Sequence, residues 1–374
     1  MTFLSAHVNT EPTWGGGEQQ TLYLLEGLRR RGYPVALFAP PGSPLLERAC
    51  SEGFDVHGIR TRSETDLLAI WRLSRFLKRL RPAVIHMHCP RAHGIGVCAA
   101  ILSGCRMKRI VSRRVNFSIY RHSFLGLNWI KYRYGVDRYL AVSASVRQVL
   151  ARDGVDPSRI RVIHSGVDPE RFRGTRPDRR AALLEEWRLP AELPLVGSIG
   201  ALDSCKGFDH FIEAASRLIA RRDCGFVLVG EGKLHAELSR KARDLGVAHR
   251  FRLVGFRWDI GEILSALDLF VLPSIEEGLG TSLLDALLLG RPTVASRAGG
   301  IPEVIRHGEN GLLVEPGDPA ALAAAMEELL SRPEEARRLG AEGSRTVLES
   351  FRADSMVEKT LESYQELCGG PVTT

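Results

Sequence analysis

Short apolar runs alternate along the chain with longer stretches in which apolar residues recur every three or four positions. In the first half, residues 18–31 have this helical spacing, and the apolar runs on either side are rich in residues that favour strands. The alternation predicts a doubly wound parallel sheet with helices on its faces. The predicted strands of this half are TFLSAHV, VALFAP, AVIHMH, RIVSRR and RYLAVS.

The alternation begins again in the second half, where five apolar runs are each followed by a helix or a helical turn. These runs are PLVGSIG, GFVLVG, FRLVGF, LFVLPS and PTVAS. The two series together predict an α/β fold with two Rossmann-like domains. Residues 166–178 are rich in Gly, Pro and charge and form the expected linker, which gives domains at 1–168 and 169–350. The helical segment from 351 to 374 either completes the second domain or packs back on the first.

Composition agrees with two folded domains. The chain has 374 residues, which is long for a single core, and its 44% hydrophobic and 25% charged residues are ordinary for a globular protein. No apolar run reaches the length of a membrane span, and the first residues lack the pattern of a signal peptide, so we expect a cytoplasmic protein. The seven cysteines are odd in number and lack CxxC spacing, which argues against a disulfide framework and a zinc site.

Positive charge is concentrated in the first half of the chain. Residues 67–136 hold 14 Lys and Arg and no acidic residue, although the net charge of the whole chain is only +7. Within this basic run, residues 67–80 form an expected amphipathic helix that either lies on an anionic membrane or packs on the domain and exposes its charges. The partner expected for the run is therefore a membrane surface or a phosphorylated acceptor. A nucleic acid is not the expected partner, because no binding module is recognisable.

Loops that follow strands are the places to look for a ligand site, since parallel sheets bind ligands at the carboxyl ends of their strands. The most informative loop is PSIEEGLGTSLLDALLLGRP. Gly278 and Gly280 allow close approach of the backbone, and the helix that follows offers free amides to a phosphate. We expect Glu277 to face the ligand. If Ser282 caps the helix, Asp285 is its third residue and serves as a capping-box acid, a ligand contact or both.

Two further loops have features of phosphate sites. GALDSCKGFDHFIEA places Lys206 just before a helix, where the helix dipole disfavours a cation unless an anion is nearby. TWGGGEQQTLYLLEGL has glycines 15–17 before an amphipathic helix, but no GxGxxG pattern with a downstream acid. His86, His88 and His93 match no zinc motif and are interpreted as strand-end packing or pocket lining.

Taken together and in this order, the loops resemble those of the retaining glycosyltransferases of family 4, which have the two-domain GT-B fold. The resemblance covers nearly the whole chain. Its main segments are WGGGEQQTLYLLEGLRRRGYPV, AVIHMH, YLAVSASVRQVL, RIRVIHSGVDPERF, VGEGKLHAEL, FRLVGF, EEGLGTSLLDALLLGRPTVASRAGGIPEVI and NGLLVEPGDPAAL.

The resemblance implies a nucleotide-diphosphate sugar, linked to UDP, GDP or ADP, held by the second domain, and an acceptor on the first domain across a cleft. It implies no metal and no further cofactor. Lys206 corresponds to the lysine that binds the diphosphate, and Glu277 to the acid that contacts the sugar. These two are the catalytic candidates. The further donor-binding candidates are Gly15, Gly16, Val254, Gly255, Phe256, Gly278, Leu279, Gly280, Thr281 and Asp285.

The chain departs from the family pattern at three places. The second acid of the family motif, usually Glu near the ribose, is Asp285, and the arginine that usually accompanies the lysine is Ala201. The family's first-domain histidine is missing from IVSRRVNFS, where Arg113, Arg114 or Asn116 occupies the acceptor side.

The function implied is retaining transfer of a hexose-like unit to an envelope glycolipid, lipopolysaccharide or polysaccharide, by an enzyme that is cytoplasmic or peripheral on the membrane. No protein nucleophile is expected, because the family's front-face mechanism passes the acceptor's proton to the leaving-group oxygen. Two alternatives remain. The departures suggest a catalytically silent nucleotide-binding or partner subunit, and the basic run suggests a nucleic-acid binder, although that run lacks a recognisable binding module.

Overall fold

The computed structural model describes residues 2–121 and 128–369. The chain forms two compact units: the first comprises Met1–Gly166 with Ala353–Thr374, and the second comprises Val167–Arg352. Residues 122–127 of the basic run and residues 370–374 of the closing segment lie outside the described residues.

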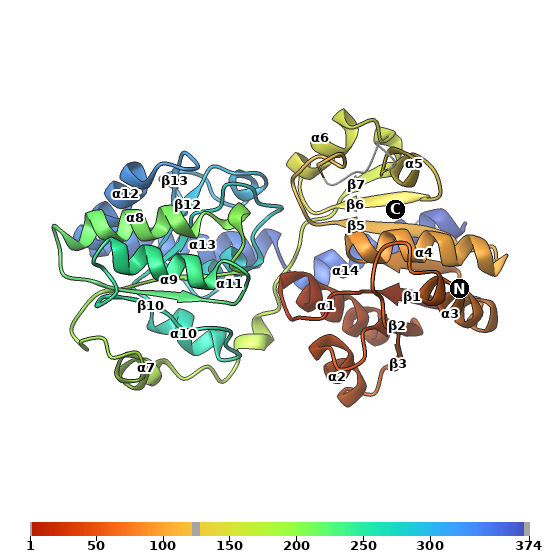
Figure 1. Cartoon of the computed structure of the whole chain (residues 1–374), viewed down its shortest axis with the longest axis horizontal. Coiled ribbons are helices and arrows are strands. Elements are labelled where there is room, and N and C mark those ends of the chain that lie inside the picture. The colour runs from red at the N-terminus through yellow and green to blue at the C-terminus, as the bar shows by residue number, and fades with distance from the viewer. Residues whose placement is uncertain (1, 122–127, 370–374) are drawn as a thin grey trace. The chain divides into compact units, whose positions relative to one another are not determined.

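The first unit is built on seven parallel strands in the order β3-β2-β1-β4-β5-β6-β7 (Figure 1). The strands are β1 (Ser5–Val8), β2 (Val35–Ala39), β3 (Asp55–Gly58), β4 (Val84–Met87), β5 (Lys108–Arg113), β6 (Arg138–Ala141) and β7 (Ile160–Val162). The helices are α1 (Gly16–Arg30), α2 (Pro44–Ser51), α3 (Leu67–Leu80), α4 (Pro90–Ser103), α5 (Asn128–Arg133), α6 (Ala144–Arg152) and α14 (Ala353–Cys368). The closing helix α14 therefore belongs to the first unit.

Helix α14 packs against α1, and a glycine makes this packing close. A Cβ placed on Gly27 of α1 would lie 2.5 Å from Val357 Cγ2, so no larger residue fits there without a shift. Leu22, Leu25 and Leu28 recur on one face of α1 and are fully buried. Tyr364 of α14 is also fully buried in this core. Burial of these apolar faces is the main stabilising contribution to the unit.

The second unit has six parallel strands in the order β10-β9-β8-β11-β12-β13. They are β8 (Leu195–Ile199), β9 (Gly225–Val229), β10 (Phe251–Leu253), β11 (Leu269–Leu272), β12 (Thr293–Ser296) and β13 (Leu312–Val314). Its helices are α7 (Arg180–Glu186), α8 (Phe208–Ile219), α9 (His235–Asp244), α10 (Ile260–Ala266), α11 (Thr281–Leu288), α12 (Pro319–Ser331) and α13 (Pro333–Ser350).

The predicted α/β class and the two Rossmann-like sheets are confirmed, but three strands were not predicted. Strands β3, β7 and β13 lie at sheet edges, and none of them is buried along its whole length. Each has only three or four residues: polar residues interrupt β3 and β7, and β13 is apolar but too short to stand out as a strand.

Strand order reverses between β1 and β4 in the first sheet and between β8 and β11 in the second. In open α/β sheets, ligands bind beyond the carboxyl ends of the strands at such a switch point. The loops after β1, β4, β8 and β11 are therefore the positions where the fold favours a site. Over residues 2–121 and 128–369, no helix combines the length and apolar character needed to cross a bilayer.

Candidate functional site

The loops after β8 and β11 are joined to each other at the switch point of the second sheet. The carbonyl oxygen of Cys205 accepts hydrogen bonds from the backbone N–H groups of Ile275, at 2.8 Å, and Glu276, at 3.1 Å. Gly207 makes this approach possible, because its φ is +63° and a Cβ placed on it would lie 2.2 Å from Pro273 O. The backbone therefore holds the two loops in fixed register.

This junction brings together the two catalytic candidates. Lys206 Nζ lies 2.6 Å from Glu277 Oε2. The same carboxylate accepts hydrogen bonds from Ser274 Oγ at 3.0 Å and from the backbone N–H of Gly278 at 3.1 Å. Glu277 is 7% exposed. Burial lowers the pKa of Lys206, but the charge of Glu277 and its hydrogen bond outweigh burial and raise that pKa above its ordinary value. Lys206 is therefore a fixed cation beyond the carboxyl ends of the strands.

Helix α11 begins beside this ion pair and leaves its first amides uncapped. Its N-cap is Gly280, with φ +90° and no side-chain hydrogen bond to the helix. A Cβ on Gly280 would lie 3.0 Å from Leu272 Cδ2. The prediction that Ser282 caps the helix is therefore wrong, because a left-handed glycine starts the helix two residues earlier. Free amides at a helix start attract anionic groups.

Asp285 lies in the second turn of α11, too far along the helix to be a capping-box acid, so that interpretation is also wrong. Its carboxylate instead pairs with Arg171, with 2.8 Å between Oδ2 and Nη1. The two side chains are 12% and 24% exposed respectively. Burial raises the pKa of Asp285, and the Arg171 guanidinium opposes that rise. Sequence reasoning missed Arg171 because its partner is 114 residues away.

The remaining donor candidates of the second unit follow its edge strand β10. Gly255 has φ +73°, and its carbonyl oxygen accepts the N–H of Gly230 at 2.8 Å. Phe256 packs edge-on against Trp258, with 4.9 Å between ring centroids. The Val254–Phe256 loop thus places an aromatic residue directly after the carboxyl end of β10.

In the first unit, the glycine loop after β1 also opens a helix without a side-chain cap. Gly15 is the N-cap of α1 and Gly16 its first residue. Glu18 is buried nearby and accepts a hydrogen bond from Asn9 Nδ2 at 3.1 Å. A Cβ on Gly17 would lie 3.7 Å from Arg114 Cδ, so Arg114 borders this loop.

The three acceptor-side candidates differ in how many hydrogen bonds they already make within the protein. Arg113 is 4% exposed and donates to Tyr132 OH at 2.8 Å and to Phe117 O at 2.6 Å. Asn116 accepts a hydrogen bond from Ser145 Oγ at 3.0 Å. Arg114 donates to Ser165 Oγ at 3.3 Å, while its buried Nε has no hydrogen-bond partner among the described residues. Burial lowers the pKa of Arg114 to about 10. The buried Nε of Arg113 also has no hydrogen-bond partner among the described residues, so both arginines keep unused hydrogen-bonding capacity, and Arg114 is the one that borders the glycine loop.

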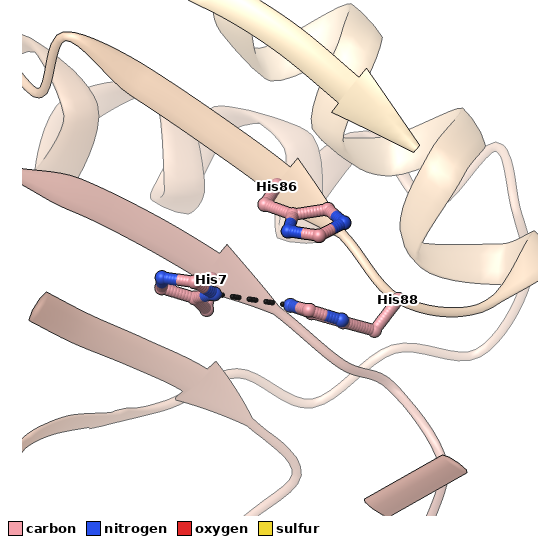
Figure 2. A group of neighbouring side chains, drawn as sticks. All are labelled: His7, His86 and His88. Atoms are coloured by element: carbon pink, nitrogen blue, oxygen red, sulfur yellow. Dashed lines mark hydrogen bonds between the residues drawn. The ribbon is translucent and has the colours of Figure 1, made fainter. Parts of the chain in front are cut away.

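A cluster of three buried histidines lies under the switch point of the first sheet (Figure 2). It contains His86 and His88 as the sequence suggested, but its third member is His7 of β1, because the parallel register places His7 opposite His86. His93 lies elsewhere, with its ring 4.8 Å from that of Tyr132.

The histidine cluster has the ligand types of a metal site, and one ring nitrogen of each lies within 4.8 Å of the others. However, most of these nitrogens already have partners. His7 Nδ1 and His88 Nε2 share a hydrogen bond of 3.1 Å, and His86 bonds to Tyr364 OH at 2.6 Å and to Ser112 Oγ at 2.8 Å. Burial lowers the pKa of His7 to about 3 and those of His86 and His88 well below 6.5. The hydrogen bonds fit a neutral packing cluster better than a metal centre.

Helix α3 lies at the start of the basic run. Ala69, Ile70, Leu73 and Leu77 bury one face of the helix, so it does pack on its unit. Leu67, Leu68 and Trp71 nevertheless remain 79%, 54% and 50% exposed. The charged side chains on the exposed face are Arg72, Arg75, Lys78 and Arg79.

Comparison with known proteins gives two matches to family models. Residues 14–171 match the model described as Glycosyltransferase Family 4, and residues 193–332 match Glycosyl transferases group 1. The chain is 26% identical to N-acetyl-alpha-D-glucosaminyl L-malate synthase of Bacillus anthracis, over 97% of both chains. It is 35% identical to the lipopolysaccharide core biosynthesis glycosyltransferase LpsE of Rhizobium meliloti, over 46% of this chain and 50% of LpsE.

Among solved structures, HepE of Anabaena in complex with UDP-glucose has a similar fold. Its TM-score is 0.85 at 20% identity, with 96% of this chain and all of that chain covered.

Proposed function

Because the chain belongs to the family 4 and group 1 glycosyltransferases and has the GT-B fold, we propose that it is a retaining, metal-independent sugar transferase. The donor is a nucleotide-diphosphate sugar, and the acceptor is an anionic glycolipid, lipopolysaccharide or polysaccharide of the cell envelope. The observation that supports this most strongly is the Lys206–Glu277 pair beside the uncapped start of α11.

The proposed donor site lies in the second unit. Lys206 and the backbone amides of Gly278–Thr281 bind the diphosphate, since both offer positive charge to phosphate oxygens. Glu277 accepts hydrogen bonds from hydroxyl groups of the sugar. Val254–Phe256 lines the base, and Asp285 reaches the ribose. In the first unit, Gly15 and Gly16 supply further amides for the phosphates.

Transfer leaves a nucleoside diphosphate, so the main task of the protein is to stabilise negative charge as the bond to the sugar breaks. Lys206 is already charged and held in place before the donor arrives. When a phosphate oxygen takes over Lys206, Glu277 becomes free to accept sugar hydroxyls. The acceptor hydroxyl then forms the new bond on the same face, and its proton passes to the leaving oxygen.

The first unit is proposed to bind the acceptor, with Arg113, Arg114 and Asn116 as candidate contacts. Arg114 is the best placed of these, because it borders the glycine loop. An anionic membrane surface would suit α3, which combines exposed Leu67, Leu68 and Trp71 with four exposed basic side chains.

A silent nucleotide-binding subunit is the second candidate, because Ala201 stands where the family usually has arginine and the family's histidine is missing. A measurement of sugar transfer distinguishes the transferase from the silent subunit. UDP, GDP and ADP sugars are incubated with envelope glycolipid and lipopolysaccharide acceptors, and the anomeric configuration of any product is read by NMR. Transfer with retained configuration that is lost in Lys206→Ala and Glu277→Ala supports the proposal. Tight nucleotide binding without transfer favours the silent subunit, and unchanged turnover in either variant contradicts the assigned site.

A further inference from the structure

The chain passes from the first unit to the second between Gly166 and Val167 and returns between Arg352 and Ala353. These two crossings lie beside each other. The backbone N–H of Val167 donates to Phe351 O at 2.9 Å, and Val167 forms an isolated parallel bridge with Arg352. The outgoing segment, Gly166–Arg171, is then held at each of its ends by one buried or half-buried side chain.

Gln20 holds the first end. Its Nε2 donates to Gly166 O at 2.6 Å, and its Oε1 accepts the N–H of Gly166 at 2.9 Å, so one side chain satisfies both backbone groups of that residue. Gln20 is 2% exposed and lies in the second turn of α1, just after the glycine loop. A buried amide that uses both its donor and its acceptor strongly restricts the backbone it binds.

Arg171 holds the other end through its 2.8 Å ion pair with Asp285 of α11. The next residue adds a packing contact, because Phe172 lies against Gly261 of α10. A Cβ on Gly261 would be 3.1 Å from Phe172 Cδ1 and 2.4 Å from Thr175 Oγ1. The segment is thereby attached to α11, which carries Asp285, and to α10.

We infer that Gln20 and Arg171 are positioning residues for transfer, which tie the glycine loop of α1 and the donor helix α11 to the two ends of one short segment. This inference rests on the proposed function. Only four residues, Val167–Glu170, lie between Gly166 and Arg171. Val167 is held by its hydrogen bond to Phe351 and its bridge to Arg352. The N–H of Glu170 donates to Asp168 Oδ1 at 3.0 Å. A segment with so little conformational freedom passes a displacement at one end to the other.

A double-mutant cycle tests the coupling. Gln20→Ala and Arg171→Ala are each expected to lower kcat for transfer by about tenfold or more, because small displacements of reacting groups are costly. Gln20→Ala should change the dissociation constant of the nucleotide by a smaller factor than kcat, since Lys206 and the start of α11, which carry most of the proposed diphosphate contacts, belong to the second unit. The double variant should lower kcat no further than the worse single variant, because breaking either attachment releases the same segment.

Matched controls come from neighbouring residues of the same type. Gln19 is 6% exposed on the same helix, and Arg173 is 79% exposed and pairs with Glu170. Gln19→Ala and Arg173→Ala should change kcat less than twofold at equal folded fraction. If the losses of the two test variants multiply in the double variant, the residues act independently and the inference is wrong.

Hydrogen exchange separates this result from failure of the proposed function. With no ligand present, Arg171→Ala should accelerate exchange at the amide of Gly166, although Arg171 does not contact it, whereas Arg173→Ala should not. Absence of that remote effect overturns the coupling whether or not the protein transfers sugar. Absence of transfer in the parent protein, with the remote effect present, overturns the proposed function and leaves the coupling standing.

Discussion

Lys206 Nζ lies 2.6 Å from Glu277 Oε2, although the two residues are 71 positions apart in the chain. They meet because each belongs to a loop after one of the two strands, β8 and β11, that flank the reversal in strand order. The pair is 24% and 8% exposed at its two side chains, so it is only partly accessible to water. A site assembled in this way has a cation and an acid in place before any ligand binds.

Removal of one member of this pair should destabilise the protein, because the other charge is left partly buried. Lys206→Met is expected to lower the free energy of unfolding by about 1–3 kcal/mol, less than for a fully buried pair. Lys233 is a suitable control, since it is 74% exposed and lies 3.5 Å from Asp203. Lys233→Met should cost less than about 0.5 kcal/mol in urea unfolding. Equal costs for the two variants would contradict a coupled pair.

Gly207 is predicted to be indispensable to the junction of the two loops. Gly207→Ala adds a Cβ 2.2 Å from Pro273 O as well as strain at φ +63°, so the loops must separate. Gly246 has φ +72°, and a Cβ added there would meet nothing within 4 Å, which makes Gly246→Ala a control for φ strain alone. We expect that control to cost about 1–2 kcal/mol and to leave nucleotide affinity intact. Calorimetry should show weaker nucleotide binding for Gly207→Ala only, and equal affinity in both variants would remove the role given to this junction.

Much of the fold follows from the sequence, because central strands and amphipathic helices have strong periodic patterns. Lys206 and Glu277 could also be proposed, since both lie in loops after apolar runs. The partner of Asp285 could not, because a side-chain pair 114 residues apart leaves no local signal. His7 was missed for the same reason. It lies beside His86 because β1 pairs with β4, and the hydrophobic pattern predicts strands without predicting which strands pair. Ser282 was chosen as a cap by residue type, whereas the backbone conformation of Gly280 decides where α11 begins.

Acid should destabilise the first unit through its buried histidines. Burial lowers the folded-state pKa values of His7, His86, His88 and His93, so the unfolded chain takes up protons first as the pH falls below about 6.5. The contribution of these histidines to stability is therefore fully present above that pH. It is lost as the pH falls from about 6.5 to the folded-state pKa of each histidine, which is about 3 for His7. Each such histidine contributes up to about 1.4 kcal/mol per pH unit.

His93→Phe should remove one of these contributions. Neither ring nitrogen of His93 has a hydrogen-bond partner among the described residues, and the ring packs against Tyr132, so an apolar ring is suited to the position. Urea unfolding between pH 5 and 6.5 should show a shallower pH dependence for this variant. A change in the exposed His235 serves as the control. An unaltered slope in His93→Phe would mean that His93 is not held neutral by burial.

Helix α3 is predicted to bind anionic membranes. Flotation with vesicles of phosphatidylglycerol and phosphatidylcholine should recover more protein than with phosphatidylcholine alone, and salt should weaken the binding. Replacement of Leu67, Leu68 and Trp71 by serine should abolish most of it. Ile101 and Leu102 of α4 are 62% and 59% exposed, and their replacement by serine is the matched control. Equal recovery on neutral and anionic vesicles would exclude this surface as a membrane contact.

Titration calorimetry of the donor site tests the central claim most directly. UDP, GDP, ADP and the sugar-linked form of each are titrated into the parent protein, Lys206→Met and Glu277→Gln. The diphosphate of one of the three nucleosides should bind the parent protein. The sugar-linked form of that nucleotide should bind the parent protein more tightly. Lys206→Met should weaken both forms by tenfold or more, on the order of 1.4 kcal/mol. Glu277→Gln should remove only the advantage of the sugar-linked form. Equal weakening of both forms by Glu277→Gln, or no binding by the folded parent, would contradict the assignment of these two residues to the donor's sugar and diphosphate.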